Sequence, residues 1–252
     1  MKKKIYAAAV MLFAFAAPFV FTACDDDDDD TEESSSSSSS NSSSSDSTDD
    51  NSSSGSTSTT AGTAVDLGLS VKWASKNVGA AGPADYGNYY SWGETETSDE
   101  YSDYYTSTWT VSDIGDISGN TTYDAATANW GSKWRMPTYV EIEELIDECT
   151  WTYTTQENSK GVDTNGYLVT GSNGNSIFLP EAGQYVDTNF VEGNGFYWSS
   201  SSDYYYFYSE AGDYNLEHFG KNACLLVILS SEYYLTAGVY RYFGFSVRPV
   251  SD

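Results

Sequence analysis

Residues 134–149 have the sequence WRMPTYVEIEELIDEC, which contains the clearest helix signal of the chain. Thr138 and Glu141 fit a capping box, in which a Ser or Thr precedes a helix and a Glu follows three residues later. Four apolar residues then follow at helical spacing and form one stripe: Ile142, Leu145, Ile146 and Cys149. The stretch therefore predicts a helix that begins after Thr138 and buries one face.

Outward from this helix, the pattern predicts mostly short strands and loops, with one more short helix over 124–130. Residues 69–74 alternate apolar and polar side chains, as a half-buried strand does. Residues 167–170 and 176–179 flank Asn173-Gly174, a pair that tolerates the positive φ of a hairpin turn. Further strands are expected over 89–92, 195–200, 225–229 and 243–248.

The N-terminal end indicates export. A basic head is followed by an apolar run over 5–21 and by Thr22-Ala23-Cys24, which is typical of a secretory signal peptide over 1–23. The ending resembles the lipobox of bacterial lipoproteins, which predicts a lipid on Cys24. Residues 5–23 are also long enough to remain as an anchor helix, but Pro18 and the small residues before Cys24 favour cleavage.

Residues 24–63 are predicted to form a disordered tether. Six aspartates, Asp25 to Asp30, follow Cys24 and resemble the surface-export signal of Bacteroidetes-type lipoproteins; the less favoured alternative is that they merely begin a solvated spacer. Residues 31–63 are almost wholly Ser, Thr, Asp, Asn and Glu, without an aromatic or large aliphatic side chain. Such a segment cannot bury enough apolar surface to offset its ordering entropy. We therefore expect an outer-membrane lipoprotein exposed on the cell surface.

Residues 64–252 have the size and composition of one folded domain. They contain all 7 Trp and nearly all of the 22 Tyr, and the whole chain has a formal net charge of −26. Nucleic acid is not expected as a partner, because its phosphates require Lys and Arg to displace counterions. Anionic membrane surfaces are disfavoured for the same reason, whereas neutral and cationic partners stay open.

A set of short motifs occurs in order along residues 65–250. They are Val65-Asp66-Leu67-Gly68-Leu69, Trp73-Ala74, Asn77-Val78-Gly79-Ala80, Asp85-Tyr86-Gly87, Tyr90-Ser91-Trp92-Gly93-Glu94-Thr95, Trp130-Gly131, Trp134-Arg135-Met136-Pro137-Thr138 with Glu141, Cys149-Thr150-Trp151, Ile177-Phe178-Leu179-Pro180, Ala182-Gly183, Tyr197-Trp198-Ser199-Ser200-Ser201, and Gly244-Phe245-Ser246-Val247-Arg248-Pro249-Val250. Together they resemble the Fibrobacter succinogenes major paralogous domain family, which occurs in many exported lipoproteins.

The Trp134–Glu141 and Val247–Val250 pieces are also similar to the C-type-lectin fold of formylglycine-generating enzymes and retroelement-diversified binding proteins. This resemblance implies an α+β, C-type-lectin-like domain with small antiparallel sheets, about two helices and long loops. We interpret the motif residues mainly as scaffold: Trp134, Arg135, Pro137, Thr138, Glu141, Trp198 and Arg248. The tryptophans are large apolar groups for a core, and the two arginines are expected to pair with carboxylates such as Glu141 or Glu94.

Catalysis is not expected, and neither a cofactor nor a metal is predicted. The cysteine pair implied by the resemblance to formylglycine-generating enzymes is missing, since Cys224 stands alone in the C-terminal part. His218 is the only histidine, and carboxylate pairs such as Glu94 with Glu96 or Glu143 with Glu144 arise by chance in so acidic a chain. An oxygen-rich loop with Asp187, Asn189, Glu192 and Asn194 is interpreted as a solvated turn. Cys149 and Cys224 are expected to be buried thiols without a bridge.

The clearest functional signal is a tyrosine-rich segment between Ser199 and Phe243. Tyr with Ser, Asn and Gly is the mixture that paratopes use, and in the retroelement-diversified proteins this position is the ligand-binding surface. The residues expected to bind are Tyr204, Tyr206, Tyr208, Tyr214, Tyr233, Tyr234, Tyr240 and Tyr242. Tyr-rich edge strands that cover a core are an equal alternative.

The sequence thus predicts a surface lipoprotein that presents a binding module to an extracellular protein or glycan. A structural or adhesive envelope protein without a specific ligand is the alternative, and a carbohydrate-active enzyme is a more distant one.

Overall fold

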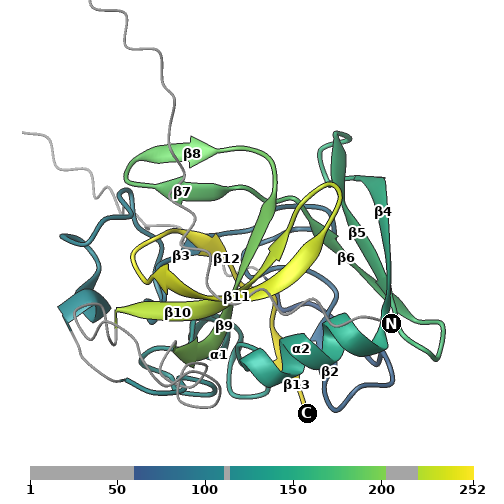
Figure 1. The fold of residues 1–252 in the computed structure, drawn as a ribbon, viewed down its shortest axis with the longest axis horizontal. Helices are drawn as coiled ribbons and strands as arrows, with labels where there is room; N and C mark the ends of the chain where they lie inside the picture. The colour runs from purple at the N-terminus through teal and green to yellow at the C-terminus, as the bar shows by residue number, and fades with distance from the viewer. Residues whose placement is uncertain (1–59, 111–113, 203–220) are drawn as a thin grey trace, which may run out of the picture. The chain divides into compact units, whose positions relative to one another are not determined.

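The computed structural model describes residues 60–110, 114–202 and 221–252, which form an α+β fold (Figure 1). Within these ranges, the strands form small sheets that are mainly antiparallel, and there are two α-helices, α1 (Ala125–Trp130) and α2 (Tyr139–Glu148). A short 3-10 helix, η1, covers Ser107–Thr110. No helix of the described ranges has both the length and the apolar character needed to cross a membrane.

The central sheet has five strands in the order β11-β10-β9-β12-β3. Their bounds are β3 Tyr89–Tyr90, β9 Gly195–Ser202, β10 Asn222–Ile228, β11 Tyr233–Tyr240 and β12 Phe245–Ser246. All neighbours are antiparallel except β12 and β9, which run parallel. The predicted strands over 195–200 and 225–229 correspond to β9 and β10. Both are buried along their whole length, so this sheet is the centre of the domain.

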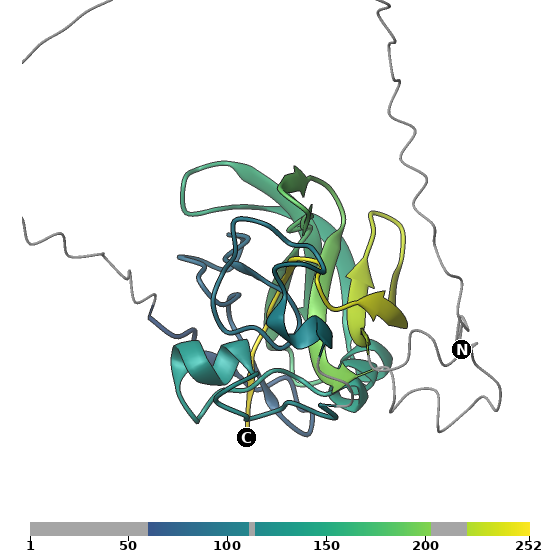
Figure 2. The same cartoon turned by 90° about the vertical axis from the view of Figure 1, so that its left-hand side faces the viewer.

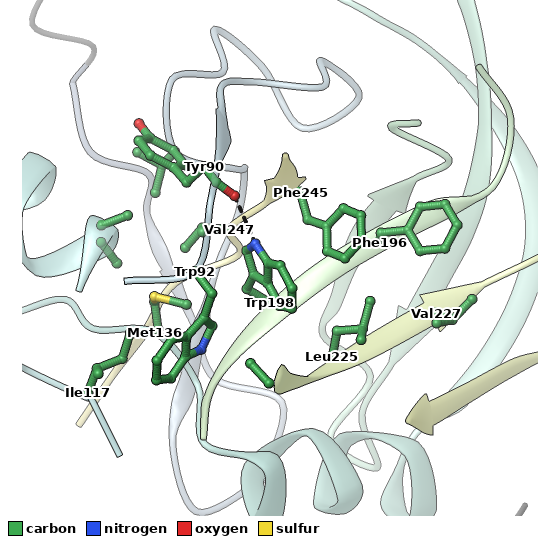
Figure 3. Packing of buried hydrophobic residues seen from close by; sticks show 14 residues of the cluster. Tyr90, Trp92, Ile117, Met136, Phe196, Trp198, Leu225, Val227, Phe245 and Val247 are labelled. Carbon is green, nitrogen blue, oxygen red and sulfur yellow. Dashed lines mark hydrogen bonds between the residues drawn. The ribbon is translucent and has the colours of Figure 1, made fainter. Parts of the chain in front are cut away.

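Side chains alternate along β9 between the two sides of the sheet, and each side has its own core. Phe196 and Trp198 belong to a first core, which Figure 3 shows together with Trp92 and Phe245. Tyr197 belongs to a second core, which also includes buried side chains of α2 and of the smaller sheets. The sheet is therefore sandwiched between two apolar layers.

Three smaller sheets surround this centre. The first has the order β1-β2-β13 (Ala64–Val65, Lys72–Ala74, Val250–Ser251), so strands from the two ends of the domain pair with one central strand. The second has the order β4-β5-β6 (Thr150–Glu157, Asp163–Thr170, Ser176–Pro180), and the third is the hairpin of β7 (Gln184–Val186) and β8 (Asn189–Val191).

The hairpin predicted around Asn173-Gly174 is confirmed. Thr170 pairs with Ser176, and Gly174 takes a φ of 86° in the turn. Strand β4 was not predicted, although Thr alternates with Trp and Tyr at its start, as in a half-exposed strand. Three expected strands are shorter than predicted, with β2 replacing 69–74, β3 replacing 89–92 and β12 replacing 243–248. In the first case, Glu144 accepts hydrogen bonds from the amide and hydroxyl of Ser70, which holds this part of the chain against α2 as a loop.

The helix predicted after Thr138 is confirmed as α2, with the capping box in place. Thr138 accepts a hydrogen bond from the Glu141 amide, and the Glu141 carboxylate accepts one from the Thr138 amide at 2.8 Å. Ile142 and Leu145 are buried, as expected. Cys149 was expected to be buried but is only half-buried, because it stands at the C-terminal cap, where the apolar stripe leaves the core.

Neither Cys149 nor Cys224 forms a disulfide, and Cys224 is fully buried. Burial, together with Glu144 and Glu148, raises the pKa of the Cys149 thiol to about 11, so this thiol is protonated at neutral pH. The second predicted helix is α1, in which the Asp124 side chain caps the first turn by accepting from Ala126 and Thr127. These local predictions are therefore correct except for the burial of Cys149.

The motif residues act as scaffold. Arg135 donates to both carboxylate oxygens of Glu141, at 2.8 and 2.6 Å, and also to Asp252 at 3.1 Å. Trp134 is buried and meets Trp130 edge to face. The Pro137 carbonyl accepts from Ser200, which joins the start of α2 to β9. These contacts tie the WRMPT segment to the central sheet and to the C-terminal strand.

Arg248 differs from the prediction, because it does not pair with a carboxylate. Its guanidinium is 1% exposed and donates to Asn77 Oδ1 at 2.7 Å, to the Ala74 carbonyl at 3.0 Å and to the Phe178 carbonyl at 2.9 Å. Glu94 instead accepts from Ser107 and Thr108. The five donors of a guanidinium suit a place where carbonyls of β2 and β6 converge, and there Arg248 satisfies buried acceptors.

Replacing Glu141 with glutamine is expected to destabilise the protein by about 1–2 kcal/mol at pH 7, because it removes a charge-assisted pair and weakens a cap. Burial opposes ionisation of Glu141, but hydrogen bonds from Arg135 and Thr138 outweigh it and lower its pKa below the ordinary value of 4.5. The stabilisation is therefore present above pH 4.5 and is lost as the pH falls through the lowered pKa. Urea unfolding at pH 7 and pH 3 measures both effects. A difference between the two proteins that stays constant from pH 7 to pH 3 would contradict the role of the ionised pair.

Candidate functional site

Half of the tyrosines predicted to bind a ligand can be placed. Cys24, Tyr204, Tyr206, Tyr208, Tyr214 and His218 lie outside the described residues. Tyr233, Tyr234 and Tyr240 are half-buried on β11, which is an edge strand of the central sheet, and Tyr242 is half-buried just after it. The predicted binding face can therefore be described for these four tyrosines and the residues around them.

Tyr233 and Tyr234 do not share a surface. Tyr233 stacks on Trp151, with ring centroids 4.1 Å apart, and belongs to the second core. Tyr234 packs against the first core, on the other side of the sheet. These two tyrosines match the alternative reading, in which a Tyr-rich edge strand covers a core.

Tyr240 and Tyr242 lie together. Their rings stack with centroids 5.3 Å apart, and Tyr242 also meets Phe243 at 4.8 Å. The turn that carries them is pinned on both sides: the Arg241 carbonyl accepts from the Trp92 amide, and the Tyr242 carbonyl accepts from the Ser91 hydroxyl at 3.0 Å. Arg241, which separates the two tyrosines in sequence, is buried and places its guanidinium carbon 4.2 Å from the ring centroid of Trp92. The position of this tyrosine pair is thus set by the first core.

A second group of aromatic rings lies around the β7–β8 hairpin. This aromatic patch consists of Tyr86, Tyr89, Tyr101, Tyr185 and Phe190. Tyr185 lies 5.0 Å from Tyr89, 5.2 Å from Tyr101 and 5.2 Å from Phe190, measured between ring centroids. Phe190 reaches Tyr89 at 5.7 Å and Tyr86 at 6.4 Å. The rings touch one another in tilted and edge-to-face contacts, so they form a continuous platform.

Backbone hydrogen bonds join the segments that build this platform. Tyr101 and Asp187 exchange two of them, at 2.9 and 3.1 Å, and Tyr185 and Gly244 exchange another two, at 2.9 and 3.0 Å. A side chain at Gly244 would place its Cβ 2.7 Å from the Tyr101 ring, so only glycine allows this approach. The aromatic patch and the Tyr240–Tyr242 turn are therefore parts of one region, linked through Gly244.

The exposure of the rings decides which of them can meet a ligand. Phe190 is 37% exposed, and Tyr104 and Tyr105, which follow Tyr101 in sequence, are 84% and 58% exposed. Tyr101 is buried, and its hydroxyl donates to the Tyr89 carbonyl at 2.8 Å. Tyr101 thus supports the platform from below, whereas Phe190, Tyr104 and Tyr105 offer their rings to solvent.

The charges around this region are negative. Burial raises the pKa of Tyr86, and Glu192 and Glu181 raise it further. Burial likewise raises the pKa of Tyr242, with added effects from Tyr240, Asp103 and Asp187. The charged residues that raise these two pKa values are all carboxylates: Glu181, Glu192, Asp103 and Asp187. The platform therefore lies in a negative electrostatic field.

The hairpin β7–β8 lies at one end of the described domain, and β13 with the C-terminus lies at the other, beside α2 (Figures 1 and 2). Strand β1 belongs to the same sheet as β13, through β2. The chain thus enters and leaves the domain through one sheet, and the hairpin that carries Tyr185 and Phe190 lies at the opposite end.

Several acidic residues that were considered for metal binding or catalysis make structural contacts or stand at turns. In the described ranges, no group of three or more His, Cys, Asp or Glu side chains could hold a metal ion. Glu94 and Glu144 are already engaged in holding loops, as described above. Asp187 and Asn194, from the oxygen-rich loop, take positive φ values of 52° and 58° at the turns that border β8.

Sequence reasoning missed the aromatic patch. Its rings come from three segments, Tyr86 to Tyr101, Tyr185 and Phe190, and no periodic pattern connects them. The usable signal was the presence of aromatic residues in short segments that are rich in glycine and acidic residues. Scans against protein-family models, curated proteins and solved structures found no match to this chain.

Proposed function

We propose that this chain is a cell-surface lipoprotein whose C-type-lectin-like domain binds an extracellular glycan or protein through the aromatic patch and the adjoining Tyr240–Tyr242 turn. The observation that carries the proposal is the continuous, partly exposed ring platform around Phe190, built on the β7–β8 hairpin, on β3 and on the loops beside them. Rings of this kind supply large contact area at low entropic cost. Binding sites are commonly carried by loops held on such scaffolds.

The other parts of the chain fit this role. A lipid at Cys24 would hold the protein in the outer membrane, and the Ser- and Asp-rich segment would act as spacer. The C-type-lectin-like assignment is supported by the motif set and by the α+β arrangement of small sheets around two helices. A binding role without catalysis agrees with the structural use of Glu94, Glu144 and Arg135.

A binding measurement tests the proposal. The unlipidated protein, made as Cys24→Ser, is screened against glycan arrays and cell-surface protein extracts, and the affinity for the strongest hit is then measured. Phe190→Ala is expected to weaken that affinity at least tenfold, since a central aromatic contact is worth about 2 kcal/mol or more.

Val140→Ala is the matched control, because Val140 is 53% exposed on α2, near the other end of the domain. It should leave the affinity unchanged. If no glycan and no protein binds, or if Val140→Ala weakens binding as much as Phe190→Ala, the proposed site is wrong.

A further inference from the structure

The charge around the aromatic patch restricts the class of ligand, and this inference rests on the proposed binding function. Tyr86 contacts Phe190, which is the most exposed ring of the patch. Glu192 and Glu181 are the carboxylates that act on Tyr86. An anionic ligand, such as a sulfated or sialylated glycan, would be repelled at this position.

The carboxylates of Glu181 and Glu192, which act on Tyr86, are available for a ligand. Glu181 accepts a hydrogen bond from the Tyr153 hydroxyl through Oε2 at 3.0 Å, which leaves Oε1 without a hydrogen bond in the described part of the chain. Glu192 follows β8 and is exposed. A carboxylate with a vacant oxygen beside an aromatic ring is a good acceptor for an ammonium group.

The shape of the patch selects between two ways of binding an ammonium group. A cage for a quaternary or methylated ammonium needs rings that face one another across a gap. Here the rings of Tyr185, Phe190 and Tyr89 contact each other at 5.0 to 5.7 Å, so they fill the space that a cage would leave open. A platform of touching rings instead suits a flat apolar face laid over it, such as that of a pyranose ring.

From this combination we infer that the ligand is a glycan with unacetylated amino groups, whose pyranose ring stacks on Phe190 and whose ammonium group lies against Glu181 and Glu192. The rings provide apolar contact area, and the carboxylates provide charge. A neutral N-acetylated sugar would use the rings but would leave both carboxylates unpaired.

The test compares two probes on the full-length unlipidated protein: oligomers of β-1,4-linked glucosamine and their fully N-acetylated counterparts. By calorimetry at pH 6, the amine oligomer is expected to bind at least tenfold more tightly than the acetylated one. Its affinity should fall several-fold between about 20 and 300 mM salt, since exposed charges are screened over about 6 Å at the higher concentration.

Glu192→Gln is expected to weaken binding of the amine oligomer several-fold and to reduce the salt dependence, to which Glu181 continues to contribute. Glu143→Gln is the matched control, because it removes one exposed carboxylate from α2, away from the patch. Circular dichroism of both variants verifies that the fold is unchanged.

Three outcomes would overturn the inference. The first is equal or tighter binding of the acetylated oligomer, still sensitive to Phe190→Ala, which would leave the proposed binding function standing. The second is equal binding of a lysine peptide with the same sensitivity to Glu192→Gln, which would replace the sugar by a protein ligand. The third is the absence of every glycan and protein ligand, which would remove the proposed function as well.

Discussion

Replacing Trp198 with alanine is expected to lower the free energy of unfolding by about 3–5 kcal/mol, the range found for large buried aromatic residues. Trp198 is fully buried on β9 and its ring lies 4.4 Å from that of Phe245 (Figure 3). Its indole nitrogen donates to the Tyr90 carbonyl at 2.8 Å, which links β9 to β3 across β12. The variant would lose both the packing and this link.

Urea unfolding followed by tyrosine fluorescence and far-UV circular dichroism measures the effect as a lower midpoint with an unchanged slope. Trp198→Phe keeps a ring but not the donor, so it should lie between the alanine variant and the native protein. Tyr104→Ala removes a ring that is 84% exposed and should change stability by less than about 0.5 kcal/mol. A loss below 1 kcal/mol for Trp198→Ala would mean that the first core does not depend on this residue.

Replacing Arg248 with methionine is expected to destabilise the protein by a similar amount, about 3–5 kcal/mol, because it leaves three buried acceptors without a donor and each of them costs about 1–3 kcal/mol. Arg248 is a buried cation whose environment lowers its pKa to about 10 through the loss of solvent. Its three hydrogen bonds satisfy Asn77 and the carbonyls of Ala74 and Phe178, which come from two separate parts of the chain. Methionine fills the volume but leaves these acceptors without their donor.

Arg248→Lys distinguishes geometry from charge. A lysine keeps the charge but cannot reproduce the planar fork, so this variant should also be destabilised, by at least about 2 kcal/mol. Arg135→Met is a suitable control, because Arg135 is partly exposed and its loss should cost less. The proposed role would be wrong if Arg248→Lys unfolded at the same urea concentration as the native protein.

Elements with a local signal could be predicted from the sequence. The capping box of Thr138 and Glu141 located the start of α2 to the residue, and Asn173-Gly174 located the β5–β6 turn. The run Leu225 to Leu229 indicated a buried strand because no polar side chain interrupts it, and β10 ends at Ile228. In each case the information lies within about ten residues.

Features that depend on distant segments could not be predicted in this way. Arg248 was expected to meet a carboxylate because acids are abundant, but it lies where the carbonyls of Ala74 and Phe178 converge. The tyrosines of β11 looked like one surface, but adjacent residues of a strand face opposite sides, which separates Tyr233 from Tyr234. The aromatic patch joins residues about a hundred positions apart, which sequence patterns do not reveal.

The short strand β1 has a mechanical consequence. It pairs just two residues with β2, Ala64 with Ala74 and Val65 with Trp73, and Thr63 adds hydrogen bonds to Ser75. Leu67, by contrast, is fully buried in the second core. A pulling force that arrives along the chain from before Ala64 would therefore peel β1 from β2 first and stop at Leu67. This segment would lengthen under load while the two cores and the aromatic patch keep their shape.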